Sequence, residues 1–217
     1  MKTFSLFLLS ALLFAGCESP RYSLLHPDSP SFKKQAPAVY EVLLTTTKGD
    51  ILMEVKREWA PHGADRFYHL VRLGYYNNAA VFRIRKATWA QFGVAADPKI
   101  AQTWRNQNLP DDPRVLPNIR GTVDYAFKEP NGRTTQMFIN LKDNRSTHDA
   151  EPFVPFAQVI SGMEVADSLY DGYGEKSGGG IRGGKQDSLF AEGNAWLQRN
   201  YPKLDYIIKV RITKKHI

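Results

Sequence analysis

The residues best suited to chemistry lie in the stretch VFRIRKATWAQFGVAADP, residues 81–98. It opens with the apolar pattern of a strand, but Arg83, Arg85 and Lys86 interrupt that pattern before WAQFG restores it. Successive side chains of a strand point to opposite faces, so Arg83 and Arg85 share one side and Lys86 takes the other. Arginine stays protonated and carries a rigid fork of donors. One arginine could therefore act on a bound group; the alternative is that all three cations lie on the surface.

Other chemical motifs are weaker. The five histidines are scattered, have no cysteine partners and lack the spacing of metal ligands, so we expect no metal site and no cofactor. The stretch GYGEKSGGGIRGGKQ, residues 172–186, is rich in glycine but follows a helix pattern. It also lacks the Lys-Ser/Thr ending of a phosphate-binding loop, and we interpret it as a long flexible loop.

The charge is mildly basic. The formal net charge is +7 and the sequence pI is about 9.4. An ordinary basic surface explains this excess, so we expect no nucleic acid as partner; an anionic membrane surface is the other partner that such a charge can attract.

The first seventeen residues, MKTFSLFLLSALLFAGC, have the features of an export signal. Lys2 is followed by an apolar run too short to span a bilayer well, and then by AGC. The ending resembles the lipobox of bacterial lipoproteins, with Phe14 where leucine is usual. This predicts a signal peptide over residues 1–16 and lipid attachment at Cys17, the single cysteine of the chain. A plain signal peptide that is cut nearby is the alternative.

A tether and a single domain follow. Residues 17–38 contain four prolines and four serines and few bulky apolar residues, which predicts a flexible, lipid-anchored tether. Residues 39–217 have the length of one domain. Glu18 follows the cysteine, and in some bacteria aspartate there favours inner-membrane retention. We therefore expect the protein at the bacterial cell envelope, anchored in the outer membrane and facing the periplasm.

The domain pattern is mainly β. Residues 40–46 and 50–56 flank a turn at Gly49 and predict a hairpin. Pro61 opens a predicted helix that Gly74 ends, and a second helix is expected over 163–170. Further strands are expected at 81–85, 89–93, 122–127, 136–140, 155–160 and within LDYIIKVRITK near the C-terminus. Many short strands with two helices indicate a closed or nearly closed antiparallel barrel.

Several motifs follow one another along the chain: GYYNNAAVFRIRKATWAQFGVAADP, RGTVDYAF, RTTQMFINLKDN, FVPFAQVISGMEVADSLY and the tail EGNAWLQRNYPKLDYI. The first four resemble, in order, motifs of the cyclophilin family of peptidyl-prolyl isomerases, and the tail resembles one found in a bacterial subgroup. The match extends over about residues 40–212. The resemblance implies a closed eight-stranded antiparallel β-barrel capped by two α-helices.

The resemblance also implies a site. In the family an arginine lies eight residues before a glutamine on the next strand, and Arg83 and Gln91 keep that spacing. These two and Phe138 are the expected catalytic residues, with Phe138 as a pocket wall. The expected substrate-binding residues are Thr88, Trp89, Tyr125, Ala126, Phe127, Gln136 and His148. The implied substrates are proline-containing segments of exported proteins, bound by a monomer that reaches the membrane through its N-terminal lipid.

The stretch IRKAT, residues 84–88, departs from the family pattern. Thr88 stands where an aromatic residue normally lines the proline pocket, and Trp89 follows where a smaller apolar residue is usual. Thr147 or His148 replaces an aromatic residue or leucine at the rim. An active isomerase, a peptide-binding module with weak or no catalysis, and a structural envelope protein therefore remain open alternatives.

Overall fold

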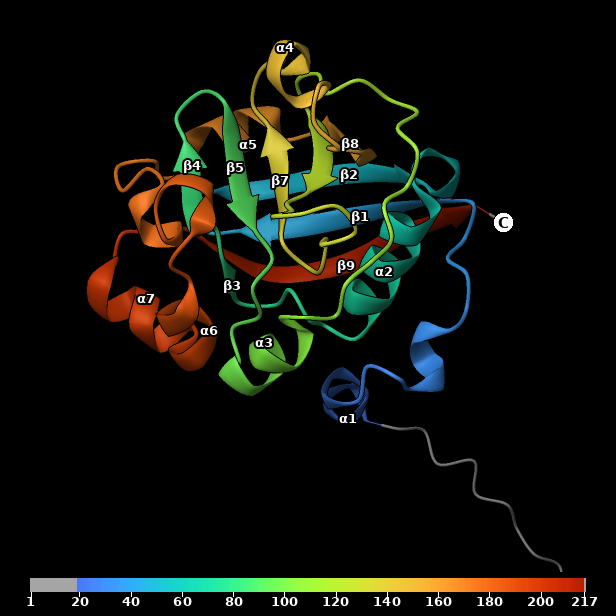
Figure 1. Ribbon diagram of the computed structural model, residues 1–217, viewed down its shortest axis with the longest axis horizontal. Coiled ribbons are helices and arrows are strands. Elements are labelled where there is room, and N and C mark those ends of the chain that lie inside the picture. Colours follow the sequence, from blue (N-terminus) through green and yellow to red (C-terminus); the bar gives the residue numbers. More distant parts are fainter. Residues whose placement is uncertain (1–18, 217) are drawn as a thin grey trace, which may run out of the picture.

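The computed structural model describes residues 19–216, apart from the side chains of Arg182 and His216. One antiparallel sheet of nine strands, in the order β3-β9-β1-β2-β8-β6-β7-β5-β4, forms its centre (Figure 1). The strands are β1 (Val39–Thr46), β2 (Gly49–Lys56), β3 (Ala79–Ala80), β4 (Arg83–Arg85), β5 (Trp89–Phe92), β6 (Thr122–Tyr125), β7 (Met137–Asn140), β8 (Pro155–Ser161) and β9 (Tyr206–His216). The predicted signal peptide and Cys17 lie outside the described residues.

The sheet is strongly curled but open, so the expectation of a closed eight-stranded barrel is wrong. The two edge strands, β3 and β4, do not pair with each other although only two residues separate them. Backbone donors near this gap bond elsewhere: the amide of Val81, just after β3, donates to the Asp205 carbonyl at 2.9 Å, and the Ile84 amide of β4 donates to the Gly174 carbonyl at 3.1 Å. The glycine-rich segment thus covers the β4 edge at the place where closure would occur.

The predicted hairpin is confirmed. In β1, buried and half-buried residues alternate, and Tyr40, Val42 and Leu44 face the core. The turn passes through Gly49, whose φ of 133° lies in the region that favours glycine. The hairpin therefore forms one wall of the core.

Helix α2 (Pro61–Arg72) is the predicted first helix, with proline in its first turn. Its predicted apolar face is buried, and Phe67 packs edge-on against Phe156 of β8 at 5.2 Å between ring centroids. The carboxylate of Asp112 accepts from the His62 and Gly63 amides at 2.9 and 3.1 Å and so satisfies two free donors of the first turn. Helix α2 consequently closes the core on one face of the sheet.

More helices are present than the two expected. Helix α5 (Met163–Ser168) confirms the second prediction, but the structure adds α1 (Pro20–Leu25), α3 (Pro98–Trp104), α4 (Arg145–His148), α6 (Asp187–Glu192) and α7 (Asn194–Asn200). These helices have four to seven residues, too few for a repeated 3.6-residue apolar pattern to stand out. None of the helices within residues 19–216 is both long and apolar enough to cross a membrane.

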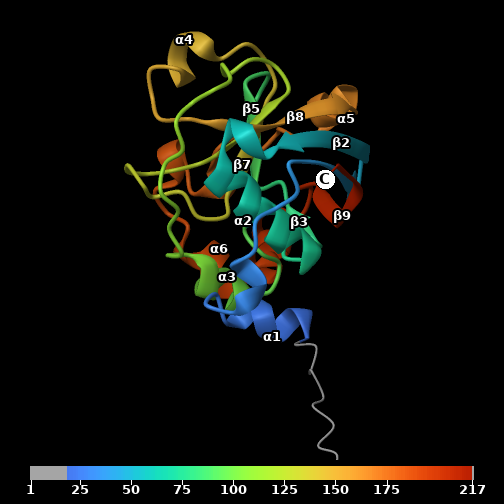
Figure 2. The same ribbon diagram turned by 90° about the vertical axis from the view of Figure 1, so that its right-hand side faces the viewer.

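The segment expected to be a flexible tether is packed on the domain from residue 20 onward. It forms α1 and a short turn at Pro30–Phe32, and Leu24 is buried. The Trp104 indole donates to the Leu24 carbonyl at 2.8 Å, and the Phe32 ring lies 4.9 Å from that indole. Aromatic packing therefore offsets the high proline and serine content. Figures 1 and 2 place α1 at the opposite end of the molecule from α4.

Candidate active site

Arg83 lies on the edge strand β4, directly opposite Gln91 on β5. The eight-residue spacing produces this pairing because the two strands form a hairpin in which Arg85 pairs with Trp89. Arg83 Nη1 donates to Gln91 Oε1 at 2.8 Å, and the arginine is only 8% exposed. Of the three cations in the opening motif, Arg83 alone is buried; Arg85 and Lys86 are exposed.

An aromatic surface lies beside the Arg83 guanidinium. The guanidinium carbon lies 4.6 Å from the centroid of the Trp89 ring, and Trp89 lies 6.4 Å from Phe138. Phe138 in turn contacts His148 and Phe153 at 5.4 and 5.2 Å. The predicted residues Trp89, Phe138 and His148 are thus brought together, and Phe153 is a member of this cluster that the sequence interpretation missed.

A chain of glutamines extends from Arg83. Gln91 Nε2 donates to Gln136 Oε1 at 2.8 Å, and Gln136 Nε2 donates to Gln186 Oε1 at 3.0 Å. The Gln136 carbonyl accepts from the Ala126 amide at 2.9 Å, which ties the chain to the end of β6. Gln91 and Gln136 therefore lie where predicted, although the predicted strands over 122–127 and 136–140 are shorter in the structure. Gln186 was not predicted.

Two expected substrate-binding residues make polar contacts within the protein. Tyr125 is fully buried, pairs with Met137 across the sheet, and donates its hydroxyl to the Gly63 carbonyl at 3.1 Å. It faces the core because Asp124, one residue earlier, pairs with Phe138 on the other face. Thr88 lies in the turn of the β4–β5 hairpin, where its hydroxyl donates to the Lys86 carbonyl at 3.1 Å.

Phe127 and Ala126 lie just past the end of β6, and both are half-buried. The Phe127 ring lies 4.6 Å from Phe153, so it extends the aromatic cluster. Ala126 contributes its backbone amide to the glutamine chain.

A buried polar network supports the segment that carries His148. Asn140 Nδ2 donates to Asp124 Oδ2 at 2.9 Å, and Asn144 Nδ2 donates to Asn140 Oδ1 at 2.7 Å and to the Thr88 carbonyl at 2.9 Å. Burial raises the pKa of the Asp124 carboxyl well above its ordinary value. Because Asn144 precedes α4, this network places His148 against Phe138.

Burial also governs the charges of the site. It lowers the pKa of Arg83, while the nearby Glu175 carboxylate raises it and Arg85 lowers it further. Burial is likewise the main reason that the pKa of His148 lies below its ordinary value. An arginine begins from such a high pKa that Arg83 remains a cation, whereas His148 is neutral at pH 7.

The glycine-rich segment, interpreted as a flexible loop, lies against Arg83. Arg83 Nη2 donates to Glu175 Oε1 at 3.0 Å, and Gln186 Nε2 donates to the Gly178 carbonyl at 3.1 Å. Glu175 and Gln186 are functional candidates that the sequence interpretation missed, since a glycine-rich stretch has no periodicity that indicates what it contacts. The one sequence feature that could have indicated Glu175 is that it is a carboxylate within a glycine-rich stretch.

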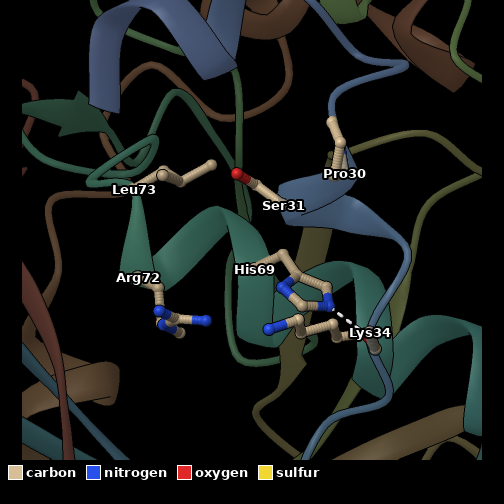
Figure 3. Close-up of a pocket in the computed structure, with 6 residues that line it drawn as sticks. All are labelled: Pro30, Ser31, Lys34, His69, Arg72 and Leu73. Atoms are coloured by element: carbon tan, nitrogen blue, oxygen red, sulfur yellow. Dashed lines mark hydrogen bonds between the residues drawn. The ribbon is translucent and has the colours of Figure 1, made fainter. Parts of the chain in front are cut away.

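Figure 3 shows a pocket between the N-terminal segment and α2. Its cavity is about 290 Å³, and it is lined by Pro30, Ser31, Lys34, His69, Arg72 and Leu73. None of these residues belongs to the predicted site. Across residues 19–216, no group of three or more His, Cys, Asp or Glu side chains is arranged to hold a metal ion.

Similarity to known proteins agrees with this geometry. A family model described as cyclophilin type peptidyl-prolyl cis-trans isomerase matches residues 41–181. Peptidyl-prolyl cis-trans isomerase A of Dickeya dadantii is 32% identical over 147 residues, which cover 65% of this chain and 75% of that protein. A probable peptidyl-prolyl cis-trans isomerase of Brucella abortus is 29% identical over 151 residues, covering 63% and 74% of the two chains.

Solved structures share the fold. A cyclophilin-type isomerase of Cryptosporidium parvum has a TM-score of 0.60 at 19% identity and covers 82% of this chain and 99% of that one. A cyclophilin of Hirschia baltica has a TM-score of 0.54 at 15% identity, covering 82% and 75%. With the family model, the curated relatives and the fold in agreement, the chain belongs to the cyclophilin-type peptidyl-prolyl cis-trans isomerases, which are enzymes.

Proposed function

We propose that this protein isomerises X–Pro bonds in exported polypeptides, with Arg83 as the catalytic residue. The observation that carries the proposal is the position of the Arg83 guanidinium, which Gln91 holds at 2.8 Å beside the Trp89 ring. A donor that is fixed in this way can meet an extended peptide that lies across the aromatic cluster.

The chemistry requires a donor and no nucleophile. The barrier to isomerisation is about 18–20 kcal/mol because resonance gives the C–N bond double-bond character. A donor that interacts best with the twisted, pyramidal prolyl nitrogen weakens conjugation only in the transition state. The guanidinium of Arg83 supplies such a donor, and its burial strengthens the interaction because water screens it less.

The aromatic cluster supplies the surface for the proline ring. Phe138 is 5% exposed and Trp89 is 9% exposed, and together with His148 and Phe153 they form an apolar wall next to Arg83. We assign the ring to this wall and the peptide backbone to Gln91, Gln136 and Ala126. Trp89 then takes the role of the aromatic residue that Thr88 replaces.

We also propose the setting. The signal-like residues 1–16 and the lipobox-like Cys17 support a monomeric, lipid-anchored protein at the bacterial envelope, attached to the outer membrane on its periplasmic side. Slow X–Pro steps take on the order of tens to hundreds of seconds without a catalyst and limit the folding of exported chains. Palmitate labelling of the wild type and of a Cys17→Ala variant tests the anchor.

A second candidate function is a peptide-binding module with little turnover. Two observations favour it: the Thr88 hydroxyl is bonded within its own turn, and the Glu175 carboxylate occupies one side of Arg83. Such a module would bind prolyl peptides on the same aromatic wall but would not accelerate their isomerisation.

The deciding experiment compares wild type, Arg83→Ala and Arg85→Ala on a short peptide with one Ala–Pro bond. NMR exchange spectroscopy measures the cis–trans rate. We expect Arg83→Ala to lower kcat/KM by about 10²–10³-fold, the range found when one transition-state donor is removed. Arg85 is exposed and should be replaceable with little effect. A folded wild type that binds the peptide without accelerating exchange would support the binding module.

A further inference from the structure

The segment Asp171–Gln186, here called the glycine loop, forms a second side of the Arg83 site. Figure 1 shows it in orange beside β4. It is attached to that edge strand by the bond from the Ile84 amide to the Gly174 carbonyl and by the ion pair between Arg83 and Glu175. The loop therefore contacts both the backbone of β4 and the guanidinium group of Arg83.

The loop backbone also lies on the Arg83 stem. A Cβ atom built on Gly178 would lie 2.4 Å from Arg83 Cβ and 2.5 Å from its Cδ. Carbon atoms that are not bonded do not approach so closely, so this packing requires glycine at position 178. The backbone of Gly178 does not itself require glycine, because its φ is not positive. The loop thus fits over Arg83 only because position 178 has no side chain.

The contact occupies the guanidinium. Nη1 is held by Gln91 and Nη2 by Glu175, while Nε is buried without a partner. Gln91 is itself fixed by Gln136, but Arg83 is the only bonding partner of the Glu175 carboxylate among the described side chains. Of the two partners of Arg83, Gln91 is therefore anchored by a further bond, whereas Glu175 can be displaced by a peptide without breaking any other side-chain bond of its carboxylate.

The loop is held unevenly. Tyr173, near its start, packs against the core and lies 5.1 Å from both Tyr170 and Tyr201. Ile181, farther along, is instead 81% exposed and adds little apolar contact. Ser177 Oγ and Arg83 Nε are both buried without a hydrogen-bond partner, and a buried unpaired donor is unfavourable. An arrangement that exposes both groups to water relieves that cost and therefore favours opening of the segment around Glu175 and Ser177.

We propose that Glu175 is a competitor built into the site, and that the glycine loop is a latch that a prolyl peptide opens. The inference rests on the proposed role of Arg83. In the free protein the carboxylate neutralises Arg83 and covers it; a bound peptide takes the Nη2 donor and displaces Glu175 together with the loop. Glu175 thereby sets how tightly substrate binds, and it takes no part in the isomerisation step.

Two variants open the latch by different means. Glu175→Gln removes the charge and keeps the shape of the side chain. Gly178→Ala adds a methyl group against the Arg83 stem and leaves the charge in place. Each has a matched control: Glu192→Gln breaks the pair of Glu192 with Arg199 on α6 and α7, and Gly184→Ala adds a methyl group that meets only the Ile181 carbonyl at 3.9 Å.

The experiment measures KM and kcat for the Ala–Pro peptide with the full chain and each variant. We expect Glu175→Gln and Gly178→Ala to lower KM about three- to tenfold with kcat unchanged, as suits the loss of a partly exposed ion pair. The two controls should match wild type. Equal KM in all five proteins would overturn the proposal, and so would a lower kcat in Glu175→Gln, since Glu175 would then position Arg83.

A binding measurement separates this proposal from the isomerase proposal. If no variant accelerates exchange, titration of the same peptide followed through the indole NMR signals still reports affinity. Tighter binding by both latch variants than by wild type and the controls would support the latch in a protein without turnover. Equal affinity in that experiment would overturn it.

Discussion

The two sides of Arg83 are built differently. On the strand side, Gln91, Trp89 and Phe138 project from paired strands, and each is less than 10% exposed. On the loop side, Glu175 lies in a glycine-rich segment, and its side chain is 26% exposed. The difference indicates that the register of the sheet fixes the surroundings of Arg83 on one side, while a segment outside the sheet supplies its partner on the other.

The largest expected difference concerns stability. Phe138→Ala should lower the free energy of unfolding by about 3–5 kcal/mol, because it removes a buried ring that contacts Trp89, His148 and Phe153. Ile181→Ala on the loop side should change it by less than about 0.5 kcal/mol, since that side chain is 81% exposed. Urea unfolding measures both. Similar losses in the two variants would mean that the loop carries as much of the stability as the strands.

The glutamine chain runs from Gln91 on the strand side of Arg83 to Gln186 on the loop side. Substitutions at its two ends should differ in their effect on kcat/KM, by an amount smaller than the difference in stability. Gln91→Ala leaves Arg83 Nη1 without its partner and should lower kcat/KM about ten- to hundredfold, the range for a hydrogen bond to a charged group. Gln186→Ala acts at the far end of the chain and should change kcat/KM by less than about threefold. Peptide exchange rates test this prediction; equal effects would show that the chain acts as one unit.

The smallest effect is expected from pH. Burial lowers the pKa of His148 in the folded protein, opposed by Asp149 and reinforced by Arg85 and Lys142. In the unfolded chain the histidine pKa is about 6.5, so His148 binds a proton more readily in the unfolded chain than in the folded protein. His148 should contribute stability above that pH and lose it as the pH falls, by at most about 1.4 kcal/mol per pH unit.

Unfolding of wild type and His148→Gln at pH 7.5 and 5.5 isolates this contribution. The pKa of His69 is also lowered by burial, but His69 is present in both proteins and cancels in the difference. Parallel pH profiles would mean that His148 titrates alike in the folded and unfolded states and is not enclosed by the aromatic cluster.

The strand side was readable from sequence because chemistry and periodicity coincide there. The resemblance singled out Arg83 and Gln91 by their spacing, and the structure joins them by a hydrogen bond; apolar periodicity predicted the β1–β2 hairpin and the buried face of α2. Tyr125 was expected to bind substrate, but its strand partner is Met137, so it faces the core, and only the register of β6 against β7 determines this.

The loop side could not be read in the same way. Glycines in the loop specify no contact, so the partners of Glu175 and Gln186 follow only from the fold. The closed barrel was wrong for the same reason, since a segment without strand character covers the β4 edge. Residues 20–36 resembled a linker in composition, and nothing local indicated that Leu24 and Phe32 would pack on Trp104.

That packed segment determines how far the domain can reach. An extended chain over residues 17–38 would span about 70 Å, at about 3.3–3.6 Å per residue. Because α1 already begins at Pro20, only three residue steps, or about 10 Å, separate position 17 from folded structure. A domain attached at Cys17 would be held close to the surface that anchors it, and unfolded chains would have to diffuse to it.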